Sequence, residues 1–98
     1  MYAATLVVRR AVSKPDALAM VALVLDSAVE RAGSARARVP VGEGAWAEVE
    51  IPKFGEPPPL AIDVYSTLSD DHARLHALRL AAVLDEQAGW DAVPDFPH

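Results

Sequence analysis

Three carboxylates near the middle of the sequence have the residue types and spacing that acid–base chemistry requires. Glu48 and Glu50 stand two residues apart, so in an extended strand both project from the same face. Together with Asp63 they could act as a general acid and base, or supply oxygen ligands to a cation. Arg38 and Arg36 are expected opposite the two glutamates, and cross-strand ion pairs would account for these charges without catalysis. We therefore assign no catalytic residue.

Two histidines, His72 and His76, have the four-residue spacing that occurs in helical zinc sites. Both side chains then project from one side of a helix. One turn further along stands Arg79, a cation where a third ligand would be needed. The chain has no cysteine, which removes thiolate ligands, disulfides and cysteine nucleophiles. We predict a solvated helix face at the two histidines, with no metal site and no cofactor.

Aromatic residues accompany the carboxylates along the same two segments. Aromatic side chains are enriched where proteins bind each other, and a wet sheet face has little other reason to display a tryptophan. The alternative is that Trp46 only covers Pro40 at the edge of the sheet. The predicted partner-binding surface consists of Trp46, Glu48, Glu50, Asp63 and Tyr65.

A hairpin about Glu43 must position this surface. Residues 35–41 and 45–51 both alternate with a period of two, and glycines flank Glu43 on both sides. The proline in the first of these strands lacks a backbone donor, which favours the edge of a sheet. The expected cross-strand pairs are Val41 with Ala45, Pro40 with Trp46, Val39 with Ala47, Arg38 with Glu48, Ala37 with Val49 and Arg36 with Glu50.

A first strand over residues 2–10 and a helix over residues 15–32 precede the hairpin. Ser13 stands three residues before Asp16, with a proline between them, which is a strong helix start, and Gly33 is a suitable stop. The centre of this helix, residues 17–25, is apolar on every side, so something is expected to cover its second side.

Residues 52–59 are expected to form an extended loop, followed by a fourth strand over residues 60–65. A second helix is expected from Thr67 or Ser69 to Ala88, and residues 89–98 form an irregular tail. The order strand, helix, three strands, helix predicts an α+β fold, a two-layer sandwich with a four-stranded, mostly antiparallel sheet and two helices on one face. Residues 1–98 are expected to form a single domain.

Composition and charge restrict the function classes. The chain has 98 residues and a net charge of −5, with +1 in residues 1–49 and −6 in residues 50–98. Because phosphate contacts need clustered Lys and Arg, we expect no nucleic-acid partner. The start of the chain lacks a signal-peptide pattern and no apolar run is long enough to span a bilayer, which predicts a cytoplasmic protein without membrane contact.

No phosphate-binding glycine loop, nucleophile elbow or dinucleotide fingerprint occurs in the sequence. The function that we expect is therefore a non-enzymatic protein-interaction or regulatory module, which binds a protein partner or forms a homodimer. A small enzyme or ligand-binding domain that uses the acidic and aromatic sheet face is one alternative. An inhibitor or immunity protein from a phage or mobile element is another, consistent with the size, acidity and composition of the chain.

Overall fold

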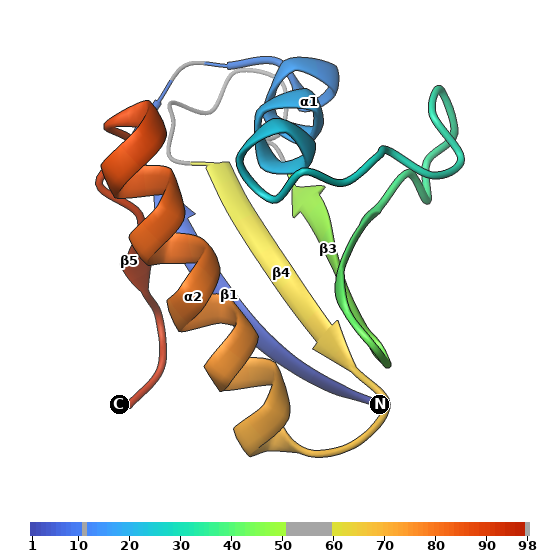
Figure 1. Ribbon diagram of the computed structural model, residues 1–98, viewed down its shortest axis with the longest axis vertical. Helices are drawn as coiled ribbons and strands as arrows, with labels where there is room; N and C mark the ends of the chain where they lie inside the picture. The colour runs from blue at the N-terminus through green and yellow to red at the C-terminus, as the bar shows by residue number, and fades with distance from the viewer. Residues whose placement is uncertain (11, 51–59, 98) are drawn as a thin grey trace.

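A computed structural model describes residues 1–10, 12–50 and 60–97 (Figure 1). The chain forms a small α+β domain with two helices and a five-stranded antiparallel sheet of strand order β2-β3-β4-β1-β5. The extended loop expected over residues 52–59 lies outside the described residues. The elements are β1 (Tyr2–Val8), α1 (Lys14–Val24), β2 (Val39–Gly42), β3 (Ala45–Glu50), β4 (Leu60–Ser66), α2 (Asp70–Ala88) and β5 (Val93–Pro94).

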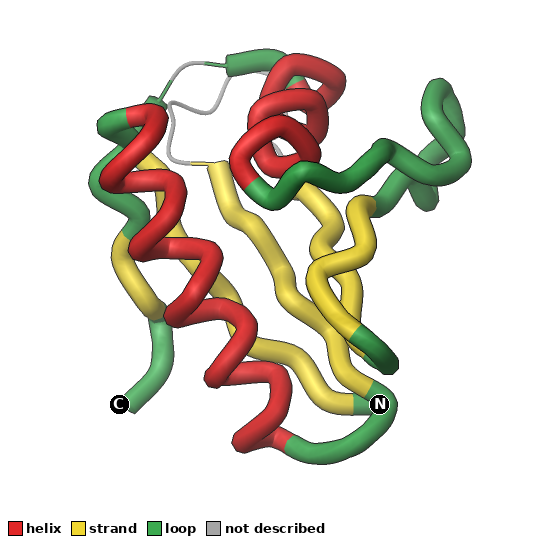
Figure 2. Tube along the Cα trace, viewed as in Figure 1, coloured by secondary structure: helices red, strands yellow, loops and turns green. Residues whose placement is uncertain are grey.

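Both helices lie on the same side of the sheet, with α2 along β1 and β4 and α1 against β2, β3 and α2 (Figures 1 and 2). From Ala4 onward in β1 and along all of β3 and β4, every second residue points toward the helices and is buried, as a period of two requires. The alternate residues form the opposite, open face. The buried strand residues are Ala4, Leu6, Val8, Ala45, Ala47, Val49, Leu60, Ile62, Val64 and Ser66.

Helix α1 starts where the sequence predicts but ends eight residues earlier than expected. The hydroxyl of Ser13 accepts a hydrogen bond from the N–H of Asp16 and caps the first turn. After Leu25, Asp26 takes a left-handed conformation with φ of 52°, and the N–H of Ser27 reaches back to the carbonyl of Ala22. The predicted end at Ala32 is therefore wrong.

Helix α2 has both of its predicted ends. The hydroxyl of Ser69 accepts a hydrogen bond from the N–H of His72, and the acidic side chains of Asp70 and Asp71 lie in the positive first turn. Gly89 ends the helix in the left-handed conformation with φ of 66°. In the part of the chain that the structure describes, neither helix is long and apolar enough to cross a membrane.

The hairpin follows the predicted register only in part. Strand pairing of Val39 with Ala47 and of Pro40 with Trp46 is confirmed. A bulge then shifts the register, so Ala45 pairs with Gly42 and the expected pairing with Val41 is wrong. Strand β2 also begins only at Val39, so the expected Arg36–Glu50 and Ala37–Val49 strand pairs are absent from this ladder.

The predicted number of four strands is wrong because the C-terminal segment adds a fifth. Val93 pairs with Val7, and Pro94 pairs with Leu6, on the edge of β1 that β4 leaves free. The carboxylate of Asp85 fixes the start of this segment by accepting a hydrogen bond of 2.7 Å from the N–H of Ala92. Two residues that include a proline carry no strand periodicity, which explains why the sequence predicts an irregular tail there.

Candidate functional site

The open face of the sheet carries all five residues of the predicted partner-binding surface. We call Trp46, Glu48, Glu50, Asp63 and Tyr65 the acidic–aromatic surface. These residues alternate with buried residues along β3 and β4. The strand register pairs Trp46 with Tyr65 and Glu48 with Asp63, so the five side chains form one continuous patch.

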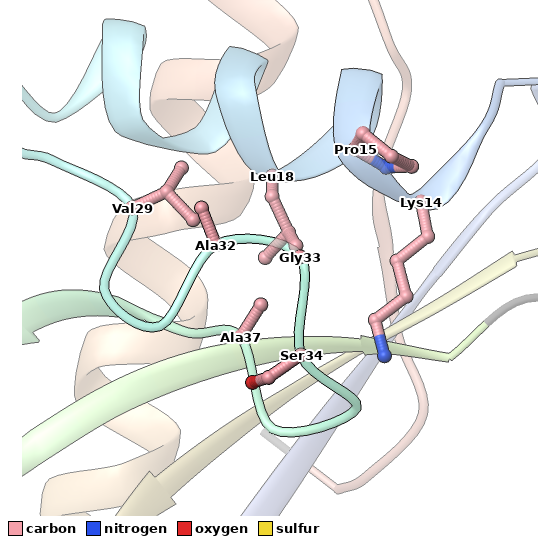
Figure 3. Close-up of a pocket in the computed structure, with 8 residues that line it drawn as sticks. All are labelled: Lys14, Pro15, Leu18, Val29, Ala32, Gly33, Ser34 and Ala37. Carbon is pink, nitrogen blue, oxygen red and sulfur yellow. The ribbon is translucent and has the colours of Figure 1, made fainter.

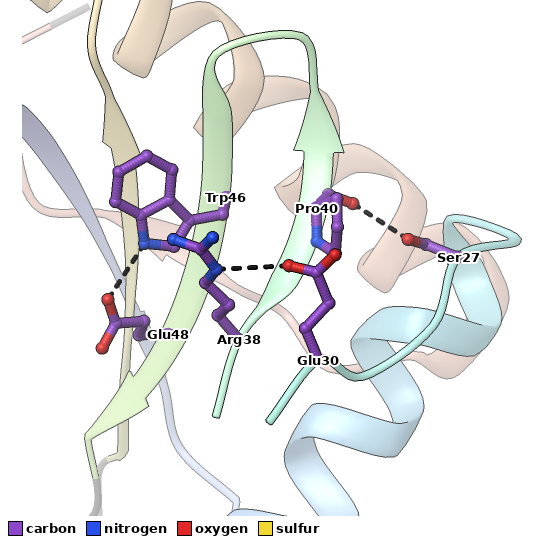
Figure 4. Close-up of polar contacts among 6 residues, drawn as sticks. All are labelled: Ser27, Glu30, Arg38, Pro40, Trp46 and Glu48. Atoms are coloured by element: carbon purple, nitrogen blue, oxygen red, sulfur yellow. Dashed lines mark hydrogen bonds and ion pairs between the residues drawn. The ribbon is translucent and has the colours of Figure 1, made fainter. Parts of the chain in front are cut away.

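The two aromatic rings are stacked on each other. The ring centroids of Trp46 and Tyr65 are 5.8 Å apart and the rings are inclined by 25°. The indole N–H of Trp46 donates a hydrogen bond of 3.0 Å to Oε2 of Glu48 (Figure 4). The guanidinium carbon of Arg38 lies 4.8 Å from the centroid of the Trp46 ring, within the range of a cation–π interaction. The tryptophan thus links a carboxylate, a phenol and a guanidinium.

The ion pair expected between Arg38 and Glu48 does not form. Nε of Arg38 instead bonds Oε1 of Glu30 at 3.2 Å, and the backbone groups of these two residues pair as well (Figure 4). The hydroxyl of Ser27 donates a second bond, of 3.1 Å, to the carbonyl of Pro40. The early end of α1 causes this change, because it frees residues 26–38 to form a loop along β2.

The partner of Asp63 is one that sequence reasoning missed. Thr5, in β1, donates a hydrogen bond of 2.6 Å from its hydroxyl to Oδ1 of Asp63. The two residues face each other in the register of β1 with β4. This pairing depends on β1 lying next to β4, and residue types alone do not reveal the order of strands that are 58 residues apart in the chain.

Tyr65 lies among the negative charges of the acidic–aromatic surface. Burial raises the pKa of Tyr65 above its ordinary value of 10.0, and the nearby charges of Asp63, Glu48 and Glu50 raise it further. The charge of Arg36 acts in the opposite direction and is the smallest contribution. The phenol therefore remains a neutral hydrogen-bond donor among carboxylate acceptors, an arrangement suited to binding cationic groups.

The two histidines of α2 do not form the solvated face that the sequence predicts. Both are half-buried, and the ring of His76 packs on Gly42 at the end of β2. Nδ1 of His72 lies 2.8 Å from the hydroxyl oxygen of Ser66, and the two Nε2 atoms are 3.1 Å apart. Burial, the charge of His72 and the charge of Arg79 lower the pKa of His76 below 6.5.

A cavity of about 260 Å³ lies between α1 and the loop that follows it (Figure 3). Its lining is mostly apolar, and Nζ of Lys14 at its rim bonds the carbonyl of Ala35 at 3.3 Å. None of the acidic–aromatic residues lines it. The lining residues are Lys14, Pro15, Leu18, Val29, Ala32, Gly33, Ser34 and Ala37.

Comparison with known proteins returns no matching protein-family model, no matching curated sequence and no matching solved structure. Within the described residues, no three His, Cys, Asp or Glu side chains are grouped so as to hold a metal ion. The open sheet face, with its five sequence-predicted residues in one patch, is the candidate functional site on geometric grounds.

Proposed function

We propose that this protein is a non-enzymatic protein-interaction module of regulatory type that binds a basic segment of a partner protein through its acidic–aromatic surface. The proposal requires a two-layer arrangement, in which the helices cover one face of the sheet and the other face is open to a partner. A cytoplasmic setting fits such a module. An inhibitor or immunity protein would act through the same kind of surface.

The observation that carries the proposal is that, among the described residues, no carboxylate of the surface forms an ion pair. Within residues 1–10, 12–50 and 60–97, the one ion pair joins Arg38 to Glu30. Glu48 accepts from an indole and Asp63 accepts from a hydroxyl, both of which are neutral donors. Carboxylates without an ion-pair partner, beside half-buried aromatic rings, attract Lys and Arg side chains and speed their association.

Arg38 itself illustrates how a partner's arginine would bind. Its guanidinium lies over the face of the Trp46 ring, and that ring stacks on Tyr65. An incoming arginine can stack on the tyrosine in the same manner while its N–H groups reach Glu48, Glu50 or Asp63. Lysine lacks the planar group that allows stacking and donation together, so arginine is the preferred side chain.

A second copy of the chain is the alternative partner. Self-association through the acidic–aromatic surface would oppose like charges, which disfavours it. The homodimer expected from the sequence would instead use the outer side of α1, where Leu23 is 73% exposed. Much of the remaining apolar surface of α1 is already covered, since Leu18 and Val21 are buried in the core and Met20 packs against it.

Binding of a fluorescent arginine-rich peptide tests the proposal, with a glutamate-rich peptide of equal length as the negative probe. The triple variant Glu48→Gln, Glu50→Gln and Asp63→Asn keeps the side-chain shapes and removes the charges. The control variant Asp26→Asn, Glu86→Gln and Asp91→Asn removes the same number of exposed charges outside the surface. We expect about a tenfold or greater loss of affinity in the triple variant, a small loss in the control, and weaker binding at higher salt.

Equal losses of peptide affinity in the triple and control variants would show that binding depends only on the net charge of the protein. That result would contradict a specific binding surface. Trp46→Ala and Glu48→Arg, introduced singly, examine stacking and charge separately. Both should weaken binding while circular dichroism shows an intact fold. Light scattering on the wild-type chain tests the homodimer. A measured mass of 10.5 kDa at micromolar protein concentration would exclude it.

A further inference from the structure

We propose that His72 and His76 form a binding site for a late first-row divalent metal ion, with Cu²⁺ bound more tightly than Ni²⁺ or Zn²⁺. Both histidines come from α2, four residues apart, and their rings meet edge to face with centroids 4.5 Å apart. Neutral imidazole nitrogens suit copper, nickel and zinc, and the usual order of affinities places copper first. The site is separate from the acidic–aromatic surface, because it lies on the helix side of the sheet.

The two Nε2 atoms lie at hydrogen-bond distance, which is also the distance between two ligands on one ion. This distance measures 3.1 Å. Two nitrogen ligands at about 2.0–2.1 Å from one metal lie about 2.9 Å apart at a right angle and about 3.3 Å apart at the tetrahedral angle. The observed separation falls between these values, so the rings need only a small adjustment to admit an ion.

Nδ1 of His72, the ring nitrogen that faces away from the proposed metal ion, has a hydrogen-bond partner of the kind found for metal-ligating histidines. Nδ1 lies 2.8 Å from the hydroxyl oxygen of Ser66, which is fully buried and also accepts a 2.9 Å bond from the N–H of Leu68. When Nδ1 carries the proton and donates it to this oxygen, Nε2 presents its lone pair to the ion. Such outer partners fix the tautomer and the ring orientation of metal ligands.

The surroundings of His76 hold its ring in place and leave room for further ligands. The ring lies against Gly42, where any side chain would overlap it. His76 also lines an open cavity of about 430 Å³ together with Leu25, Val41 and Arg79. Since no third protein ligand is grouped with the pair among the described residues, water or a small anion completes the coordination, and the charge of Arg79 favours an anion.

Titration of the purified chain with CuCl2, followed by calorimetry and electron paramagnetic resonance, tests the site. We expect one ion per chain, with hyperfine splitting from two imidazole nitrogens. His72→Gln and His76→Gln keep a polar side chain, and each should lower the affinity at least about tenfold. His98→Ala is the matched control, because it removes the third histidine of the chain and should leave the affinity unchanged.

Retention of wild-type affinity in His76→Gln would overturn the proposal, as would loss of binding in His98→Ala. Circular dichroism of each variant without metal establishes that the fold persists. If a glutamine variant unfolds, the wild-type spectrum decides, because hyperfine splitting from fewer than two imidazoles contradicts the site. The expected metal-induced rise in melting temperature should also be absent in the glutamine variants.

Discussion

Nε of Arg38 lies 3.2 Å from Oε1 of Glu30, and this ion pair joins the loop after α1 to the edge of the sheet. It also removes from Glu48 the cation that alternation along the hairpin predicts for it. Glu48 accepts from the indole of Trp46 instead. Glu48 is left without this cation because of where α1 ends, since a helix extended to residue 32 would not bring Glu30 to Arg38.

Alanine substitution should lower the free energy of unfolding less at Trp46, which lies on the surface, than at Trp90, which lies in the core. Trp46 is half-buried and stacks on Tyr65 and under Arg38, so Trp46→Ala should lower the free energy of unfolding by about 1–2 kcal/mol. Trp90 is 7% exposed and packs in the core, so Trp90→Ala should cost about 3–5 kcal/mol. Urea unfolding monitored by circular dichroism measures both, and equal costs would contradict the surface position of Trp46.

Local signals in the sequence predict the helix starts and the centre of the hairpin. Ser13 and Ser69 cap the two helices as expected, and Gly89 ends the second, because a cap depends on residues within one turn. The pairing of Pro40 with Trp46 also follows from alternation near a tight turn. Short-range rules succeed where the partners lie close together in the sequence.

Long-range pairings were beyond these rules. The bond from Thr5 to Asp63 requires β1 beside β4, and β5 requires the free edge of β1. The end of α1 at Val24 also escapes prediction, because residues 25–32 retain helix-forming residues and the competing interaction is the bridge between Glu30 and Arg38, which strand alternation does not reveal. Strand alternation was sufficient to predict that these five residues share the open face, whereas their union into one patch also requires β3 beside β4.

Tyr65 should titrate above pH 10. Burial is the main reason, and the charges of Asp63, Glu48 and Glu50 add to it. Ultraviolet absorbance of the phenolate in a Tyr2→Phe background isolates this group, since the chain has two tyrosines. Glu50→Gln, which removes one of the charges, should shift the titration toward lower pH.

The same raised pKa predicts alkaline destabilisation. The folded chain retains the phenolic proton of Tyr65 at a pH where the unfolded chain has lost it, so the contribution is present below pH 10 and is lost as the pH rises through the folded pKa. Urea midpoints should therefore fall above pH 10, and fall less in Tyr65→Phe. An identical alkaline fall in both proteins would argue against a raised pKa.

His76 should make the protein less stable in mild acid. Burial lowers its pKa below 6.5, with smaller contributions from His72 and Arg79. The unfolded chain then takes up a proton at a higher pH than the folded chain, so stability is present above pH 6.5 and is lost as the pH falls through the lower, folded pKa. Thermal unfolding in metal-free buffer should show this loss in wild type and a smaller one in His76→Gln. If the melting temperature of His76→Gln fell with decreasing pH as steeply as that of the wild type, the loss of stability would come from other titratable groups.

Gly42→Ala should disrupt the histidine pair without straining the backbone. A Cβ atom at this position would overlap the imidazole of His76 and lie 2.9 Å from its Nε2 atom, so the ring must move away. The φ angle of Gly42 is outside the left-handed region, which leaves steric overlap as the cause. We expect a loss of about 1–3 kcal/mol in unfolding free energy, together with shifted ring resonances of His72 and His76 in nitrogen-15 spectra.

Gly33→Ala is the matched control for this substitution. Gly33 has φ of 83°, and a Cβ atom added there would meet no atom within 4 Å, so alanine strains the backbone but touches nothing. It should cost about 1 kcal/mol and leave the histidine resonances in place. Shifted ring signals in Gly33→Ala, or unshifted ones in Gly42→Ala, would contradict the packing of His76 on β2. Because the glycine makes room for the ring, Gly42→Ala should also weaken Cu²⁺ binding, whereas the control should not.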